Sequence, residues 1–128
     1  LVYYFSTIEV VNGKKLNGNM TLGENIGDNG CLNIALRAYH NAQKEGHVIS
    51  SDQKDFTADQ LFFLGYARIW ASNNRDQYMD MLLTQDVHSP NMARVNGALP
   101  HIDAWYQAFG VKKGNRLFLP KKKRAQVW

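Results

Sequence analysis

The sequence has little of several features that mark particular classes of protein. Its 128 residues include a single cysteine, Cys31, which excludes an internal disulfide bond and a cysteine-rich zinc site. No apolar run approaches the roughly 20 residues that a membrane-spanning helix needs, so no membrane span is predicted. The motifs H-E-x-x-H, G-x-x-x-x-G-K-[ST], G-x-G-x-x-G and G-x-S-x-G are also absent. No single short motif therefore identifies a catalytic or nucleotide-binding site.

Acidic side chains are missing from the end of the chain. Residues 111–128 carry seven basic side chains and no acidic one, whereas the remaining 110 residues carry 8 basic and 11 acidic ones, a balance of −3. The net charge of +4 therefore describes a basic tail on a mildly acidic body. A nucleic-acid-binding domain usually presents a basic face rather than a basic tail. The distribution favours a solvated surface segment, and binding of nucleic acid through the tail is the weaker alternative.

Length and composition predict one globular domain. The chain is 45% apolar and 20% charged, which suffices for a hydrophobic core. Its first residues, LVYYFSTIEVV, contain neither an initiator methionine nor the basic start of a signal peptide. We therefore expect the sequence to be a piece of a longer protein.

Turn and capping residues predict a mainly α fold with a small N-terminal β element. Residues 1–20 read as extended structure with turns at Asn12-Gly13 and at residues 17–18. A capping box at residues 21–24 predicts a helix to residue 44, ended by Gly46. After a polar linker at residues 46–56, further helices are predicted over 57–71, 74–83, 91–99 and 102–109, and Gly110 should close the last of them. The helix from Thr57 begins with a second capping box at residues 57–60, is apolar on most sides and should be buried. Ser89 should cap the helix that follows it.

Two carboxylates four residues apart are candidates for binding a metal. Glu24 and Asp28 lie on one face of the first long helix. One could ligate a metal ion while the other ligates it too or orients a histidine ligand. Alternatively, Glu24 completes the capping box and Asp28 complements the helix dipole. Spacing alone favours this second interpretation.

His88 is the histidine whose neighbours most suggest chemistry. Asp86 can hold its imidazole in one tautomer or keep it charged, and a cationic histidine at the edge of a cleft stabilises a developing oxyanion. Arg94, six residues further on, can bind a carbonyl or carboxylate group through its fork of donors. Taken alone, a histidine in a loop is more often an ordinary surface residue. The other three histidines, at positions 40, 47 and 101, have no metal-like spacing and are predicted at the surface or at helix ends.

Five blocks of sequence together are more informative than any one motif. In order, they are LNGNMTLGENIGDNG, LFFLGYARIW, DVHSPNMARVNG, WYQAFGV and KKKRAQVW. They resemble the C-terminal region of the neprilysin family of zinc metallopeptidases, which includes neprilysin, the endothelin-converting enzymes and bacterial oligopeptidases. The resemblance implies that residues 1–128 form the C-terminal part of a thermolysin-like catalytic domain that hydrolyses peptides.

The resemblance also implies roles for residues of the zinc site. In that family two histidines of an H-E-x-x-H helix and one later glutamate hold the zinc ion. Glu24 matches the glutamate ligand, and Asp28 matches the aspartate that orients a zinc-bound histidine. His88 matches the histidine that stabilises the tetrahedral oxyanion, with Asp86 as its orienting partner.

Three further positions match residues that contact the peptide substrate. Arg94 matches the arginine that binds a backbone carbonyl group of the substrate. Ile69 and Trp70 match residues near the pocket for the side chain that follows the scissile bond. Peptide substrates and the remainder of the catalytic domain are thus the partners that the resemblance implies.

Departures from the family pattern qualify these expectations. The H-E-x-x-H motif, which the family places upstream, is absent, so the chain has one of three zinc ligands and should be inactive by itself. A face that would contact the missing helix should be exposed and cause self-association or partial disorder. Ala71 and Ala125 stand where the animal enzymes have cysteine, which points to a bacterial protein. Family members lie mostly outside the cytoplasm, in the periplasm or extracellular space, although some bacterial ones are cytoplasmic, so localisation stays open.

A non-catalytic function is the principal alternative to the peptidase. The same helices could serve as a scaffold or binding module whose partner the residues do not identify. An H-E-x-x-H motif in the preceding coding region would distinguish the two hypotheses.

Overall fold

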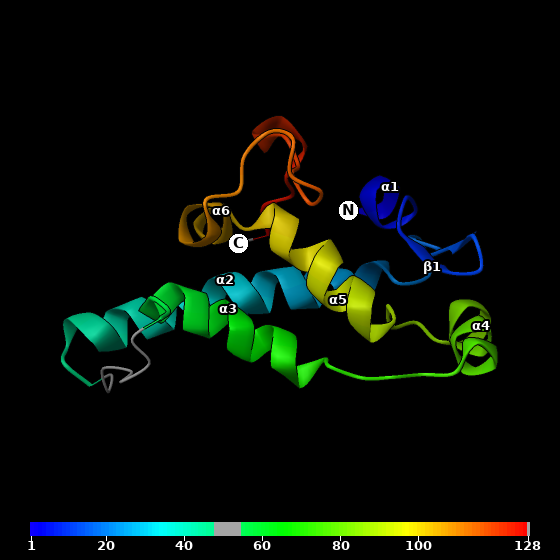
Figure 1. The fold of residues 1–128 in the computed structure, drawn as a ribbon, viewed down its shortest axis with the longest axis horizontal. Helices are drawn as coiled ribbons and strands as arrows, with labels where there is room; N and C mark the ends of the chain where they lie inside the picture. Colours follow the sequence, from blue (N-terminus) through cyan, green and yellow to red (C-terminus); the bar gives the residue numbers. More distant parts are fainter. Residues whose placement is uncertain (48–54, 128) are drawn as a thin grey trace.

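The computed structural model describes residues 1–47 and 55–127, and helices dominate them (Figure 1). The elements in chain order are α1 (Val2–Phe5), β1 (Glu9–Val11), β2 (Lys14–Lys15), α2 (Leu22–Lys44), α3 (Ala58–Ile69), α4 (Asp76–Gln85), α5 (Asn91–Ala98), η1 (Leu99–His101), α6 (Asp103–Phe109) and η2 (Lys121–Lys123). The prediction of a mainly α fold with a small N-terminal β element is confirmed. Within the described residues, no helix is both long enough and apolar enough to cross a membrane.

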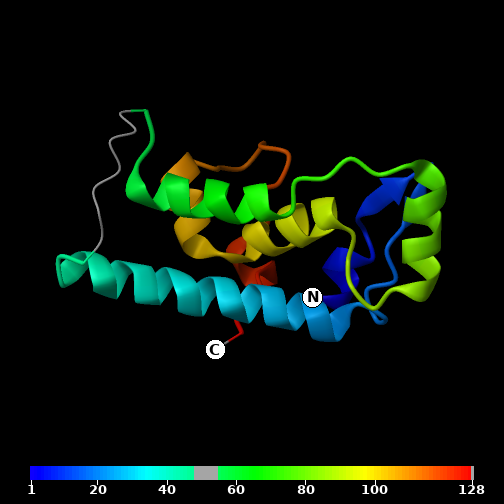
Figure 2. The same ribbon diagram turned by 90° about the horizontal axis from the view of Figure 1, so that it is seen from below.

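The long helix α2 forms one side of the molecule. Figure 2 shows α3 along the opposite side, α5 and α6 between the two, and α4 with strand β1 at one end. The buried residues that join these helices form one main cluster, made of Leu32, Leu36, Phe63, Ala98, Leu99, Ile102, Trp105 and Tyr106. A smaller cluster of Phe5, Leu16, Leu83 and Ala93 lies at the end where α4 and the hairpin meet. The helix α5 contributes to both clusters and therefore connects the two ends of the core.

The N-terminal segment contains the predicted hairpin but is not extended throughout. β1 and β2 pair antiparallel around Asn12 and Gly13, whose φ values of 50° and 77° are those of a two-residue hairpin turn. Val2–Phe5 instead forms a helical turn. The ring of Phe5 packs so closely on Gly97 that a Cβ atom there would lie 2.5 Å from the ring. Burial of Phe5 outweighs the strand propensity of these residues, which is weak compared with tertiary packing.

The two predicted capping boxes have different outcomes. At α3, Thr57 and Gln60 form the box as predicted, each side chain accepting a hydrogen bond from the other's backbone N–H. At α2, the Thr21 side chain makes no capping hydrogen bond, so the box predicted at residues 21–24 is absent. Its hydroxyl accepts from Asn25 Nδ2 at 2.9 Å. The carboxylate of Glu24 therefore does not turn back to the backbone of its own helix.

The helix α3 is less buried than its apolar sequence predicts. Phe63 is its one fully buried residue, whereas Leu64 and Ile69 are exposed. α4 begins two residues later than predicted, at Asp76, and α6 ends at Gly110, which has the expected left-handed φ of 61°. Most of the predicted linker at residues 46–56 lies outside the described residues.

The basic tail is only partly a solvated segment. Lys121, Lys122 and Lys123 are exposed, as predicted. Arg124 instead lies 3.4 Å above the centre of the Tyr106 ring and donates to a carboxylate oxygen of Asp103 at 2.7 Å. This cation–π contact and ion pair attach the tail to α6.

His101 lies at the end of a short helix, as predicted, but it is buried rather than at the surface. Its ring packs edge-on against Tyr4 with ring centres 4.9 Å apart, and its Nδ1 accepts the backbone N–H of Ala125 at 2.9 Å. Burial lowers the pKa of His101 to about 4, because a charged imidazole loses its hydration there.

This shift predicts that the chain loses stability as the pH falls from 7.5 to 5. Between the unfolded pKa of 6.5 and the folded pKa of about 4, the unfolded chain binds more protons, so the free energy of unfolding decreases with decreasing pH. We expect a loss of about 2 kcal/mol at pH 5, measured by urea unfolding. His101→Gln should remove this component of the pH dependence, and the exposed control His47→Gln should retain it. Equal pH dependence in both variants would contradict the assignment.

Candidate functional site

His88 lies on the loop between α4 and α5, and Asp86 fixes the orientation of its ring. One oxygen of Asp86 accepts from Nδ1 of His88 at 2.7 Å and from its backbone N–H at 2.9 Å. These two hydrogen bonds, the backbone one first, lower the pKa of Asp86, so it stays a carboxylate at acidic pH. The second ring nitrogen, Nε2, is directed away from Asp86.

Glu24 faces this second nitrogen from the first turn of α2. Its Oε2 lies 3.2 Å from Nε2 of His88, and both side chains are close to half exposed. Two residues that are 64 positions apart are thus brought together at the surface. The imidazole stands between two carboxylates, one within its own loop and one on α2.

A buried hydrogen bond joins the His88 loop to α2 at the same point. The Ser89 hydroxyl donates to Oδ1 of Asn25 at 2.6 Å, and both residues are almost fully buried, at 2% and 1% exposure. The predicted role of Ser89 as helix cap is therefore wrong, because its hydroxyl is used across the molecule and Pro90 precedes the first helical residue. Sequence reasoning missed Asn25, and only its position directly after Glu24 could have drawn attention to it.

Asp28 and Arg94 form a second connection between α2 and α5. The guanidinium donates from Nε and Nη2 to the two oxygens of Asp28 at 2.7 and 2.6 Å, and the side chains are only 14% and 11% exposed. Hydrogen bonding to Asp28 raises the pKa of Arg94. The guanidinium also lies 3.9 Å from the centre of the Trp70 ring. Tyr66, which sequence reasoning missed, donates to the backbone carbonyl of Arg94 at 3.1 Å.

Ile69 is not brought to His88. It is 73% exposed at the end of α3. It lines a mainly apolar groove of about 240 Å³ between α2 and α3, together with Asp28, Cys31, Leu32, Ala35, Phe62 and Tyr66. This groove starts one helical turn from Glu24 on α2.

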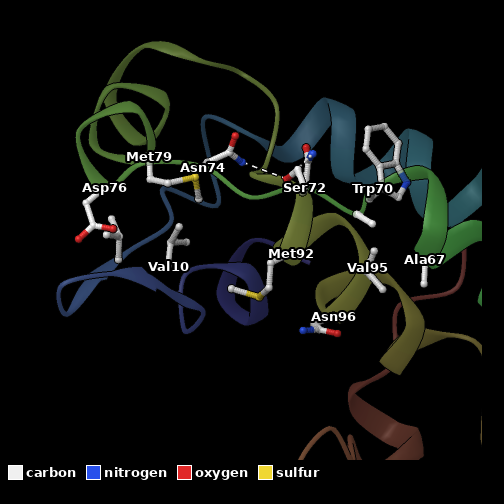
Figure 3. A pocket seen from close by; sticks show the side chains of 13 residues that line it. Val10, Ala67, Trp70, Ser72, Asn74, Asp76, Met79, Met92, Val95 and Asn96 are labelled. Atoms are coloured by element: carbon white, nitrogen blue, oxygen red, sulfur yellow. Dashed lines mark hydrogen bonds between the residues drawn. The ribbon is translucent and has the colours of Figure 1, made fainter.

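Two cavities lie near these residues, and α5 lines part of each. A cavity of about 300 Å³ is lined by Asp86, His88 and Arg94 and by residues of α4. A larger hollow of about 420 Å³ lies between the hairpin, the end of α3, α4 and α5 (Figure 3). Its lining is mainly apolar side chains and amides, and Asp76 is its only titratable residue. Of the candidate site residues, Asp86, His88 and Arg94 therefore line the smaller of these two cavities.

The described residues do not complete a metal site by themselves. Nowhere in residues 1–47 and 55–127 do three or more His, Cys, Asp or Glu side chains converge as metal ligands do. A zinc site needs three or four protein ligands. Glu24 is a half-exposed carboxylate outside any capping box, so it can contribute one ligand to a site that other residues complete.

Comparison with known proteins decides the family. The model of peptidase family M13 matches residues 1–125. The chain belongs to peptidase family M13. It is 36% identical to human neprilysin, covering 100% of this chain and 17% of that protein. It is 40% identical to human endothelin-converting enzyme 1, covering 92% of this chain and 15% of that protein.

Solved structures of M13 relatives share the fold of this chain. The zinc metalloprotease Zmp1 of Mycobacterium tuberculosis superimposes with a TM-score of 0.90 at 33% identity, over 100% of this chain and 20% of Zmp1. PepO of Lactobacillus rhamnosis gives a TM-score of 0.80 at 35% identity, over 99% of this chain and 18% of PepO. The predicted fold, that of the C-terminal region of such a peptidase, is confirmed. The M13 chain spans a fifth or less of the length of these relatives.

The burial of the Asp28–Arg94 pair predicts that it matters for stability. We expect Arg94→Met to lower the free energy of unfolding by about 3 kcal/mol, because a mostly buried carboxylate loses its partner. Lys14→Met, which removes the exposed ion pair with Asp80, is the control and should change it by less than about 1 kcal/mol. Urea unfolding of the three proteins measures the difference. Equal effects of the two substitutions would show that the buried pair has no special role.

Proposed function

We propose that this M13 chain is the C-terminal part of a zinc-dependent endopeptidase or oligopeptidase, in which Glu24 is the third zinc ligand and His88 stabilises the oxyanion. The observation that carries this proposal is the approach of Glu24 to within 3.2 Å of a histidine that Asp86 holds in place. Membership of a peptidase family, and the likeness to a zinc metalloprotease, support it further.

Asp86 and His88 act together on the charge that develops during peptide hydrolysis. The carboxylate of Asp86 accepts from Nδ1 and orients the ring, and Nε2, which faces Glu24, donates when the imidazole is in its charged form, because both ring nitrogens then carry a hydrogen. A donor fixed in this way stabilises negative charge without the reorganisation that water would need. When bound, zinc supplies a Lewis acid beside this donor. Glu24, which no capping box holds, is free to turn its carboxylate to that ion.

Asp28, Arg94 and Trp70 position the substrate and a neighbouring ligand. A guanidinium has five N–H donors and two of them serve Asp28, so others remain for a backbone carbonyl group of the peptide. Each oxygen of Asp28 accepts one hydrogen bond from Arg94 and keeps a second lone pair, with which Asp28 can orient a zinc-bound histidine. Trp70 stacks on the guanidinium of Arg94, and Trp70 and Ile69 belong near the pocket for the side chain after the scissile bond, although the two line different hollows of this chain.

The groove between α2 and α3 receives the rest of the catalytic domain. Its exposed apolar side chains, such as Ile69, and its position beside Asp28 suit a helix that brings two histidine ligands to Glu24. Without that helix, the chain lacks two zinc ligands and a general base. The isolated chain is therefore inactive, and its partners are peptide substrates and the remainder of its own catalytic domain.

The peptidase proposal is tested with the full-length protein and a quenched fluorescent peptide. We expect cleavage that a chelator abolishes, and loss of both zinc and activity in Glu24→Ala. In His88→Ala, zinc should remain while kcat falls about 100- to 1,000-fold, which is typical for loss of an oxyanion donor. His47→Gln serves as the control and should resemble the wild type. Full activity in Glu24→Ala would leave a non-catalytic helical scaffold or binding module as the better hypothesis.

The isolated chain should self-associate through the groove. We expect light scattering to show oligomers, and a dye that binds apolar surfaces to fluoresce with the chain alone. Ile69→Ser should reduce both signals, because it removes a large apolar side chain that is 73% exposed in the groove. Tyr3→Ser removes an even more exposed aromatic side chain from a different surface and should leave both signals unchanged. A monomer that binds no dye would count against the docking role of the groove.

A further inference from the structure

The hydrogen bond between Ser89 and Asn25 occupies an unusual place in the chain. Ser89 directly follows His88, and Asn25 directly follows Glu24. The bond of 2.6 Å between them is buried, whereas His88 and Glu24 are partly exposed. A buried attachment therefore lies immediately beneath the pair of residues that face each other at the surface.

From Asn25, a series of hydrogen-bonded neutral groups continues back to the residues that precede α2. Asn25 donates from Nδ2 to the Thr21 hydroxyl at 2.9 Å, and that hydroxyl donates to the carbonyl of Asn17 at 3.3 Å. Asn25 accepts from Ser89 through its oxygen and donates to Thr21 through its amide nitrogen, so its orientation is determined at both ends. No member of this series carries charge, and the attachment is maintained across the pH range in which carboxylates and histidines titrate.

The other contacts of His88 do not fix its distance from α2. Asp86 lies in the same loop, so it orients the ring but moves with it. The Asp28–Arg94 pair does attach α5 to α2, but Arg94 lies six residues beyond His88 along the chain. His88 itself is too exposed for packing to hold it. Ser89 is the residue adjacent to His88 that is bound directly to α2.

We infer that Ser89 and Asn25 are positioning residues, which set the separation between His88 and Glu24 through the buried hydrogen bond between them. The inference rests on the proposed function, in which that separation determines where the oxyanion donor stands relative to the zinc ligand. One peptide bond joins His88 to Ser89, and their Cα atoms are about 3.8 Å apart. A displacement of Ser89 therefore displaces His88 by a similar distance. Misplacement by about 1 Å in an active site can lower the rate about 100-fold.

The test uses kinetics of the full-length protein in two backgrounds. In the wild-type background, Ser89→Ala and Asn25→Ala should each lower kcat about 10- to 100-fold, with KM within about twofold and zinc content unchanged. In the His88→Ala background, Ser89→Ala should lower kcat no further, because it acts through His88. Ser6→Ala, which removes a hydroxyl that accepts the backbone N–H of Gly18, is the matched control and should leave kcat unchanged.

A conservative variant separates positioning from folding. Ser89→Thr keeps a hydroxyl that can donate to Oδ1 of Asn25, so kcat should recover to within about threefold of the wild type, whereas Ser89→Ala remains impaired. Thermal unfolding of each variant measures any loss of stability separately. A lower melting temperature with normal kcat in Ser89→Ala would overturn the inference, as would an equal further loss of kcat in the His88→Ala background.

The outcomes distinguish this inference from the proposed function. If Glu24→Ala and His88→Ala retain full activity, the peptidase roles themselves fail. If both variants lose activity as expected while Ser89→Ala keeps the wild-type kcat, only the positioning role of Ser89 and Asn25 is wrong.

Discussion

The buried ion pair between Asp28 and Arg94 is the interaction on which the arrangement of the site depends. It joins two helices through residues that are 66 positions apart and uses both oxygens of one carboxylate. Because each charge is mostly removed from water, either partner alone would be strongly unfavourable, so the pair forms together or not at all. Trp70 closes over the guanidinium and Tyr66 holds the backbone of Arg94, so α3 is tied to the same point. Three helices thus meet at one charged contact.

The polar contacts around this ion pair are of two kinds, buried and exposed. The ion pair and the Ser89–Asn25 hydrogen bond are buried and hold α5 and its preceding loop against α2. The pairs that His88 makes with Asp86 and Glu24 remain open to water. The proposed function would account for such a division, because groups that act on a substrate need an accessible position on a rigid support.

Sequence predicted the parts of this structure that short-range signals determine. The hairpin turn at Asn12, the capping box at Thr57 and the end of α6 at Gly110 each depend on residues within a few positions of one another. The incorrect predictions concern features that depend on contacts between residues far apart in the chain. The helical turn at the N-terminus follows from contact of Phe5 with Gly97, and Ser89 does not cap a helix because Asn25, 64 positions away, accepts its hydrogen bond. Spacing placed Glu24 and Asp28 on one face of a helix, but it could not place His88 or Arg94 opposite them.

The spacing of residues along the first turns of α2 determines which of its side chains reach their partners. Glu24 and Asn25 contact the His88 loop, and Asp28, one turn further on, contacts Arg94 of α5, so residues of one turn have partners in two elements. An α-helix turns by about 100° for each residue, so one inserted or deleted residue between Thr21 and Asp28 would rotate one set of side chains away from its partners. Insertions in the turns before the helix would leave these directions unchanged. The segment from residue 21 to residue 28 should therefore keep its length among related proteins, even where the residues that make none of these contacts differ.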